Sequence, residues 1–182
     1  MKIEFSLNEN DFLVHQLYVA SKSDRIRKKR QKNKIVSPIF FVVFGFLFYI
    51  QDKAIFAIFL FVIIGILWFF FYPKWEKKHY VNHYKNFIKD NYKKRFGKNL
   101  TLDFNNDFIL AYDDGSESKI LTKELEEIDE ITTAIFIRLK GGQSIILPKN
   151  KIKEIDCLTK ELKELATYLN IKYILDYKWE WK

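Results

Sequence analysis

Apolar residues concentrate in two uncharged runs near the first third of the chain. Residues 35–50 read IVSPIFFVVFGFLFYI and residues 54–72 read AIFAIFLFVIIGILWFFFY, with Gln51, Asp52 and Lys53 between them. As helices the runs would be roughly 24 and 28 Å long at ~1.5 Å per residue, close to the ~30 Å hydrocarbon core of a bilayer. Because backbone groups in lipid must pair within their own segment, the pattern predicts a transmembrane helical hairpin over residues 35–72.

Two other interpretations of these runs are weaker. A buried hairpin in a soluble core would need more surrounding chain than 182 residues provide. A cleaved signal peptide is disfavoured because 34 residues precede the first run and no small-residue cleavage site follows it.

Charge predicts the orientation of the hairpin. The chain carries a net charge of +8, and residues 22–34 and 74–98 hold eight and nine basic residues against one and two acids. Both basic segments border the same end of the hairpin, so the positive-inside rule places both termini in the cytoplasm and Gln51–Lys53 outside. The expected location is a bacterial inner (cytoplasmic) membrane, crossed twice.

The basic segments predict contact with anionic lipid headgroups. Residues 99–182 are mildly acidic, so the overall basicity does not indicate nucleic-acid binding. The side chains expected at the membrane surface are Arg25, Arg27, Lys28, Lys29, Arg30, Lys32, Lys34, Lys74, Lys77 and Lys78.

The segments next to the hairpin predict helices. In residues 1–34, alternation at Ile3, Phe5 and Leu7 predicts a strand, and Asn8 or Asn10 can cap a helix running on through the basic segment into the first span. After Pro73, residues 73–98 predict a separate basic amphipathic helix. Its aromatic face could lie on the inner leaflet or, as we favour, pack on the N-terminal helix or the following domain.

From residue 99 the apolar period changes from helical spacing to two. Alternating segments, a turn at Asp113–Gly115 and a Gly141–Gly142 hairpin predict a small antiparallel sheet of four to six strands over 99–170. An amphipathic helix that Asn150 could cap would cover this sheet. The acidic residues of 124–130 are expected on a solvated edge. The predicted fold class is therefore an α+β membrane protein.

The C-terminal residues 171–182 alternate aromatic and polar side chains. This pattern predicts one more strand, and pairing with Met1–Leu7 is one option. Alternatively, the segment could anchor at the membrane interface or offer an edge to a partner. The residues that would bind such a partner are Tyr173, Tyr177, Trp179 and Trp181.

The whole layout resembles the YcxB-like family of small bacterial membrane proteins. The features that carry the resemblance are HQLYVASKSDRIRKKRQKNK before the hairpin, and GGQSIILPKNKI, with its Ile145–Lys149 segment, before the last helix. The resemblance covers nearly the whole chain. It implies a membrane location and a C-terminal domain similar to a pleckstrin-homology sheet with a capping helix, and it implies no activity.

No pattern of catalytic or metal-ligating residues emerges. His79 and His83 share a helical face, but Tyr80 stands where a zinc peptidase has glutamate. Because Cys157 is the single cysteine of the sequence, a disulfide framework is ruled out. Gly45 and Gly65 form no small-residue motif, although they could let the two helices approach. We expect no enzyme activity and no cofactor.

Two functions fit these observations. One is a non-catalytic inner-membrane protein that displays a cytoplasmic binding or regulatory domain, with a protein partner, a lipid or a second copy as ligand. The alternative is an immunity protein that neutralises a membrane-acting or translocated bacterial toxin.

Overall fold

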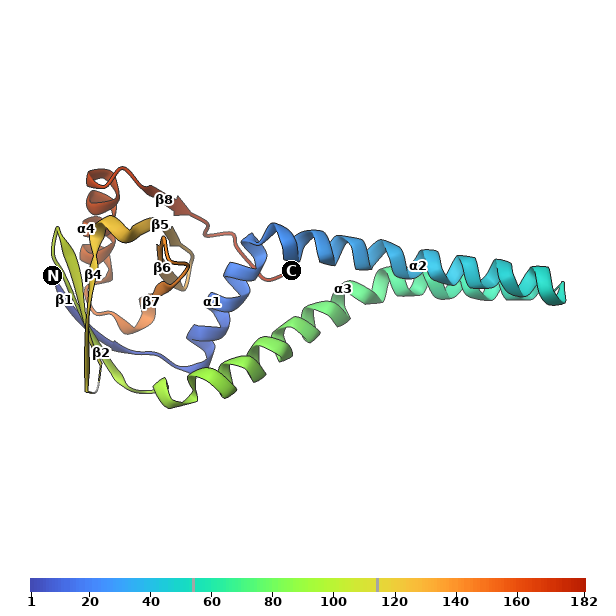
Figure 1. The fold of residues 1–182 in the computed structure, drawn as a ribbon, viewed down its shortest axis with the longest axis horizontal. Helices are drawn as coiled ribbons and strands as arrows, with labels where there is room; N and C mark the ends of the chain where they lie inside the picture. Colours follow the sequence, from blue (N-terminus) through green and yellow to red (C-terminus); the bar gives the residue numbers. More distant parts are fainter. Residues whose placement is uncertain (54, 114) are drawn as a thin grey trace. The chain divides into compact units, whose positions relative to one another are not determined.

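The computed structural model describes residues 1–53, 55–113 and 115–182, and it divides into two compact units. The sheet unit comprises Met1–His15 and Lys85–Glu180, and the hairpin unit comprises Gln16–Tyr84 and Trp181–Lys182. Ala54, where the second predicted span begins, and Asp114 of the predicted turn lie outside the described residues. Figure 1 shows the course of the chain.

The hairpin unit is built on two long helices. They are α2 (Asp24–Asp52) and α3 (Ile55–Tyr92), which run side by side (Figure 1). Each is long and apolar enough to cross a membrane. In the most apolar 18-residue window of each helix, only 6% and 11% of the residues are buried, so the described part of this chain does not enclose either helix.

Helix boundaries differ from the sequence prediction at both ends of the hairpin. Helix α1 (Glu9–Lys22) ends before the basic segment, and α2 begins anew because the Ser23 side chain accepts from the N–H of Ile26. Pro73 does not start a new helix, since α3 continues through it. Proline within a helix removes one N–H donor, and a long helix can absorb that loss when its other turns remain intact.

Two glycines set how closely α2 and α3 approach. A Cβ atom added at Gly45 would lie 3.0 Å from the Phe61 Cβ and 3.4 Å from the Ile58 Cα, whereas one at Gly65 would meet its nearest atom, the Pro38 carbonyl oxygen, at 3.6 Å. The helices therefore pack backbone to side chain at Gly45, as the sequence suggested, and leave ordinary room at Gly65.

This difference predicts unequal effects of alanine at the two glycines. Gly45→Ala should push the helices apart and destabilise the hairpin by about 1–2 kcal/mol through overpacking. Gly65→Ala should be neutral or slightly stabilising, because alanine favours the helix. Unfolding of each variant in mixed micelles titrated with sodium dodecyl sulfate measures its change in stability. Equal midpoints for the two variants would contradict the predicted close contact at Gly45.

The sheet unit contains two four-stranded sheets. The first has the antiparallel order β1-β2-β3-β4, and the second has the order β7-β6-β5-β8, in which β8 runs parallel to β5. The strands are β1 (Lys2–Ser6), β2 (Asn99–Phe104), β3 (Phe108–Asp113), β4 (Ser116–Leu121), β5 (Leu125–Glu130), β6 (Ala134–Leu139), β7 (Ser144–Pro148) and β8 (Lys172–Leu175). The predicted single antiparallel sheet over 99–170 was thus incomplete, because strands from both ends of the chain join it.

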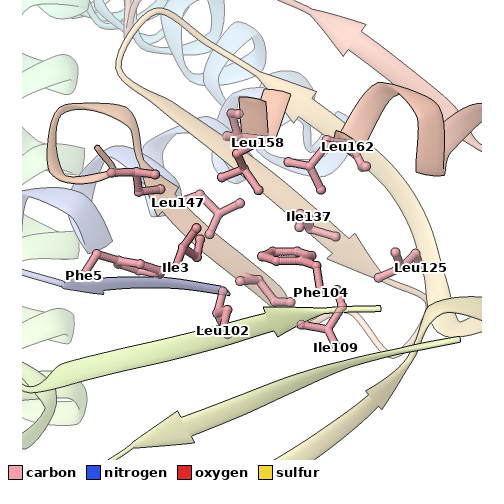
Figure 2. Close-up of a cluster of buried hydrophobic side chains, with 14 of the residues drawn as sticks. Ile3, Phe5, Leu102, Phe104, Ile109, Leu125, Ile137, Leu147, Leu158 and Leu162 are labelled. Carbon is pink, nitrogen blue, oxygen red and sulfur yellow. The ribbon is translucent and has the colours of Figure 1, made fainter. Parts of the chain in front are cut away.

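The two sheets and helix α4 (Ile155–Tyr168) enclose one apolar core (Figure 2). Each sheet has one apolar face that must be buried, and the alternating residues predicted from the period of two supply it. Core side chains from the first sheet include Ile3, Phe5, Leu102, Phe104 and Ile109, and those from the second sheet and α4 include Leu125, Ile137, Leu147, Leu158 and Leu162. Helix α4 begins at Ile155, so Asn150 lies in the preceding 3-10 turn and does not cap it.

The N-terminal helix is capped and packed as its sequence suggests. The Asn8 side chain accepts the Asp11 N–H at 3.0 Å, and the Asp11 carboxylate accepts the Asn8 N–H at 2.8 Å, a reciprocal cap. The Phe12 ring lies 4.8 Å from the Tyr92 ring and 5.9 Å from the Phe96 ring. These contacts agree with the packing interpretation of the aromatic face of 73–98.

Only the first third of the C-terminal segment is a strand. The ladder ends where the Asp176 N–H donates to the Glu130 oxygen at 2.8 Å, because β5 itself ends at Glu130. The alternation of residues 176–182 therefore has no neighbouring strand to pair with. The option of pairing with Met1–Leu7 was wrong, since β1 pairs with β2 and β8 pairs with β5.

Candidate functional site

The basic residues predicted at the membrane surface lie in the N-terminal part of α2 and near the middle of α3. Two of the ten, Arg30 and Lys34, are half-buried. The remaining eight are exposed, namely Arg25, Arg27, Lys28, Lys29, Lys32, Lys74, Lys77 and Lys78. Arg27 forms an exposed ion pair with Asp24 at 2.6 Å. The structure therefore presents most of this positive charge to its surroundings.

Arg30 has a different environment, because a buried carboxylate faces it across the hairpin. Its Nε donates to Oε2 of Glu76 at 3.0 Å, and the hydroxyl of Tyr72 donates to Oε1 of Glu76 at 3.0 Å. Glu76 is buried, and a buried carboxylate is tolerated only when it is paired and hydrogen-bonded. These bonds tie α2 to α3 at the base of the hairpin.

Two aromatic rings complete this group around Arg30. The guanidinium lies 4.7 Å from the Trp181 ring centroid and 5.7 Å from that of Tyr80, within reach of a cation–π interaction. Burial and then the charge of Glu76 raise the pKa of Tyr80, although Arg30 acts in the opposite direction. We call Arg30, Tyr72, Glu76, Tyr80 and Trp181 the Arg30 cluster. It holds positive charge in place and offers no group poised for catalysis.

The tail aromatics have partners within the chain. Trp181 belongs to the Arg30 cluster, and its indole N–H also faces the Lys77 carbonyl oxygen at 3.4 Å. The Tyr173 and Tyr177 hydroxyls donate to Glu130 at 2.6 and 3.0 Å. The N–H of half-buried Trp179 donates to the Asp176 oxygen in a turn. The predicted partner-binding residues thus make intramolecular contacts.

Glu130 is the buried centre of a second polar group, which we call the Glu130 cluster. It comprises Glu130, Lys149, Tyr173 and Tyr177, and the Lys149 ammonium donates to Glu130 Oε1 at 2.6 Å. Burial alone raises the pKa of Glu130, but the three donors outweigh it and the net pKa is lowered. Burial and the bond to Glu130 raise the pKa of Tyr173. The cluster fastens the segment after α4 to β5 and to the 3-10 turn that follows β7.

Acidic residues 124–130 are not the solvated edge that the sequence suggested. They form most of β5, an interior strand, in which Asp129 and Glu130 are buried. Burial and then the charge of Asp129 raise the pKa of Glu127, although its ion-pair partner Arg138 lowers it. One signal for this burial is visible in the sequence, because apolar Ile128 lies among the acids and Ile131 follows them.

Residues considered for metal binding are scattered in the structure. His79 and His83 are exposed on α3, and the His79 ring stacks on Trp75 at 5.2 Å. Cys157 is an exposed free thiol on α4. Among the described residues, no group of three or more His, Cys, Asp or Glu side chains could hold a metal ion.

Sequence reasoning missed three residues that the structure brings forward. Glu76 and Glu130 each neutralise a cation in a buried site. Glu76 had a visible signal as one of two acids among the nine basic residues of 74–98. His15 had none, although its Nε2 is buried without a hydrogen-bond partner and its ring meets Phe136 at 5.1 Å.

Comparisons with known proteins give no match for this chain. No protein-family model, no curated protein and no solved structure matches it. The resemblance to the YcxB-like family therefore stays a prediction, and the function must be argued from the geometry.

Proposed function

We propose that this chain is an inner-membrane protein whose α2–α3 hairpin crosses the bilayer and whose sheet unit is a cytoplasmic binding or regulatory domain. The observation that carries the proposal is the surface of the hairpin. Large apolar side chains stay exposed along both helices, with Phe56 86% exposed and Phe70 69% exposed. In water such a surface would be unfavourable by about 25 cal/mol per Å². A bilayer covers it without a partner protein.

The pairing of β1 with β2 supports a return of the chain to its starting side. Lys2 pairs with Asp103 and Ser6 pairs with Asn99, while the whole of α2 and the whole of α3 lie between these strands in sequence. A membrane crossed once would separate the two strands. Two crossings keep them together, and the basic ends favour the cytoplasmic side.

The architecture of the sheet unit supports a binding role more than a catalytic one. Two sheets packed face to face with a helix across the core agree with the pleckstrin-homology-like domain that the family resemblance implies. Its buried Glu130 carboxylate is paired with the ammonium of half-buried Lys149. We propose membership of the YcxB-like family on the same grounds, with no substrate and no cofactor.

The single cysteine gives a direct test of this topology. Cys157 is exposed, so a membrane-impermeant maleimide should label it only after spheroplasts are lysed. A matched control carries Gln51→Cys in a Cys157→Ser background and should be labelled in intact spheroplasts. The protein should also stay in the pellet after an alkaline carbonate wash.

The carbonate wash and the maleimide labelling can each contradict a different part of the proposal. Release into the carbonate supernatant would refute the membrane-spanning hairpin. Labelling of Cys157 in intact spheroplasts would leave the hairpin in place and refute the cytoplasmic orientation.

A further inference from the structure

A narrow groove runs between α2 and α3 on one face of the hairpin unit. Its volume is about 330 Å³, and every residue that lines it is apolar. The lining residues are Pro38 and Val42 from α2, and Val62, Gly65, Ile66, Phe69 and Phe70 from α3. Gly65 contributes no side chain to the groove, and a Cβ atom added there would meet the Pro38 carbonyl oxygen at 3.6 Å.

The dimensions of the groove suit a hydrocarbon chain. From Val62 to Phe70 it follows α3 for eight residues, about 12 Å at the helical rise. A second helix, about 10–12 Å in diameter with its side chains, could place only a few side chains in a groove of this volume, whereas an acyl chain could lie along its whole length. An acyl chain is narrow, flexible and wholly apolar, as the lining demands.

Positive charge lies at one end of the groove. Lys34 precedes Pro38 by one turn of α2, and its Nζ lies 4.4 Å from the ring centroid of Phe69. Lys74 follows Phe70 by one turn of α3 and is exposed. Residues four apart share a helix face, so both lysines extend the two walls of the groove beyond its apolar part.

The nearby carboxylates do not compete for these lysines. Residues 16–84 contain three acids, Asp24, Asp52 and Glu76. Asp24 pairs with Arg27, Glu76 is buried against Arg30, and Asp52 lies at the opposite end of α2. The cationic end of the groove is therefore available to an anion.

We propose that this groove binds one anionic phospholipid, with an acyl chain along Gly65 and the headgroup phosphate between Lys34 and Lys74. The inference rests on the proposed membrane function and deepens it, because it replaces diffuse attraction to a charged surface with one defined site. A lipid without net charge would fill the apolar part equally well. The two lysines would therefore favour a headgroup with net negative charge.

Lipid retention by the purified full-length protein tests this proposal. The protein in mild detergent is mixed with palmitoyl-oleoyl phosphatidylglycerol or with phosphatidylcholine of the same chains, and native mass spectrometry counts bound lipids. We expect one retained phosphatidylglycerol at concentrations where phosphatidylcholine is lost. Lys34→Gln and Lys74→Gln should each weaken retention about fivefold. Gly65→Leu should fill the groove and weaken the retention of both lipids.

Matched variants separate a site from general electrostatics. Lys28→Gln with Lys29→Gln removes two charges from exposed positions of α2 outside the groove, and it should weaken retention far less than either groove variant, which removes only one. Equal retention of the two lipids by the wild type would overturn the proposal. It would equally be overturned if the Lys28 and Lys29 variant lost as much lipid as the Lys34 and Lys74 variants, or if lipid-free dimers formed through this face.

The carbonate wash keeps this inference apart from the proposed function. A protein that stays in the pellet but shows no preference for phosphatidylglycerol refutes the lipid site alone. A protein released by the wash refutes both.

Discussion

Replacing Glu130 with glutamine should lower the free energy of unfolding of the sheet unit by about 2–3 kcal/mol, because a buried cation and two hydroxyls lose a charged acceptor. Lys149, Tyr173 and Tyr177 all donate to this carboxylate. Denaturant unfolding of the full-length protein in mild detergent, followed by near-ultraviolet circular dichroism, measures the change. The loss should also free β8 from β5, which hydrogen exchange at residues 172–175 would show.

Two controls make this result specific. Glu117→Gln changes an exposed carboxylate of β4 and should alter stability by less than about 0.5 kcal/mol. Tyr177→Phe removes one bond from a half-exposed ring and should cost about 1 kcal/mol. A Glu130→Gln protein as stable as the Glu117→Gln protein would show that the cluster does not hold the segment.

Acidification should destabilise the sheet unit through His15. Burial lowers the pKa of His15 from 6.5 to about 4. The unfolded chain therefore binds a proton between these values that the folded chain does not, and stability falls as pH drops from about 6.5 towards 4. Between pH 7 and pH 4.5 the loss from this residue is about 2 kcal/mol.

The comparison with His15→Leu isolates this contribution from other titrating groups. Leucine removes the proton-binding site. It also removes the buried Nε2 of His15, which has no hydrogen-bond partner. On acidification from pH 7 to pH 4.5, the free energy of unfolding of the wild type should fall by about 2 kcal/mol more than that of the His15→Leu protein. A difference between the two proteins that is constant with pH would contradict the lowered pKa.

Local patterns in the sequence predicted most helices and strands correctly. The Gly141–Gly142 hairpin joins β6 to β7 as expected, and Gly142 has φ of 81°, which glycine adopts without strain. The apolar runs lie within α2 and α3. These features depend on neighbours in the chain, so the period of apolar residues and the turn chemistry suffice to find them.

Features that depend on distant residues could not be found in this way. Met1 bonds to Phe104, 103 positions away, and nothing near either residue specifies that partner. Similarly, residues 176–182 alternate like a strand, but β5 ends at Glu130 and offers them no ladder. Glu130 itself has the sequence appearance of a surface acid, and only the folded position of Lys149 makes its burial favourable.

The candidate sites also include some residues that the sequence predicts and others that only the folded chain brings together. The exposed lysines and arginines of α2 and α3 were predictable, since charge at the end of an apolar run needs no tertiary contact. The pairing of Arg30 with Glu76 and the groove beside Gly65 depend on how two helices meet. The periodicity of a sequence does not specify which residues of α2 lie opposite which residues of α3.

The position of β1 in the first sheet has a consequence for the order of biogenesis. Lys2–Ser6 leaves the ribosome long before Asn99–Phe104, its neighbour in the sheet. Throughout that interval the segment has an unpaired, aggregation-prone edge. Synthesis of the whole hairpin must therefore precede completion of the first sheet, so under the proposed membrane location the hairpin would reach the bilayer while the sheet unit is still unfinished.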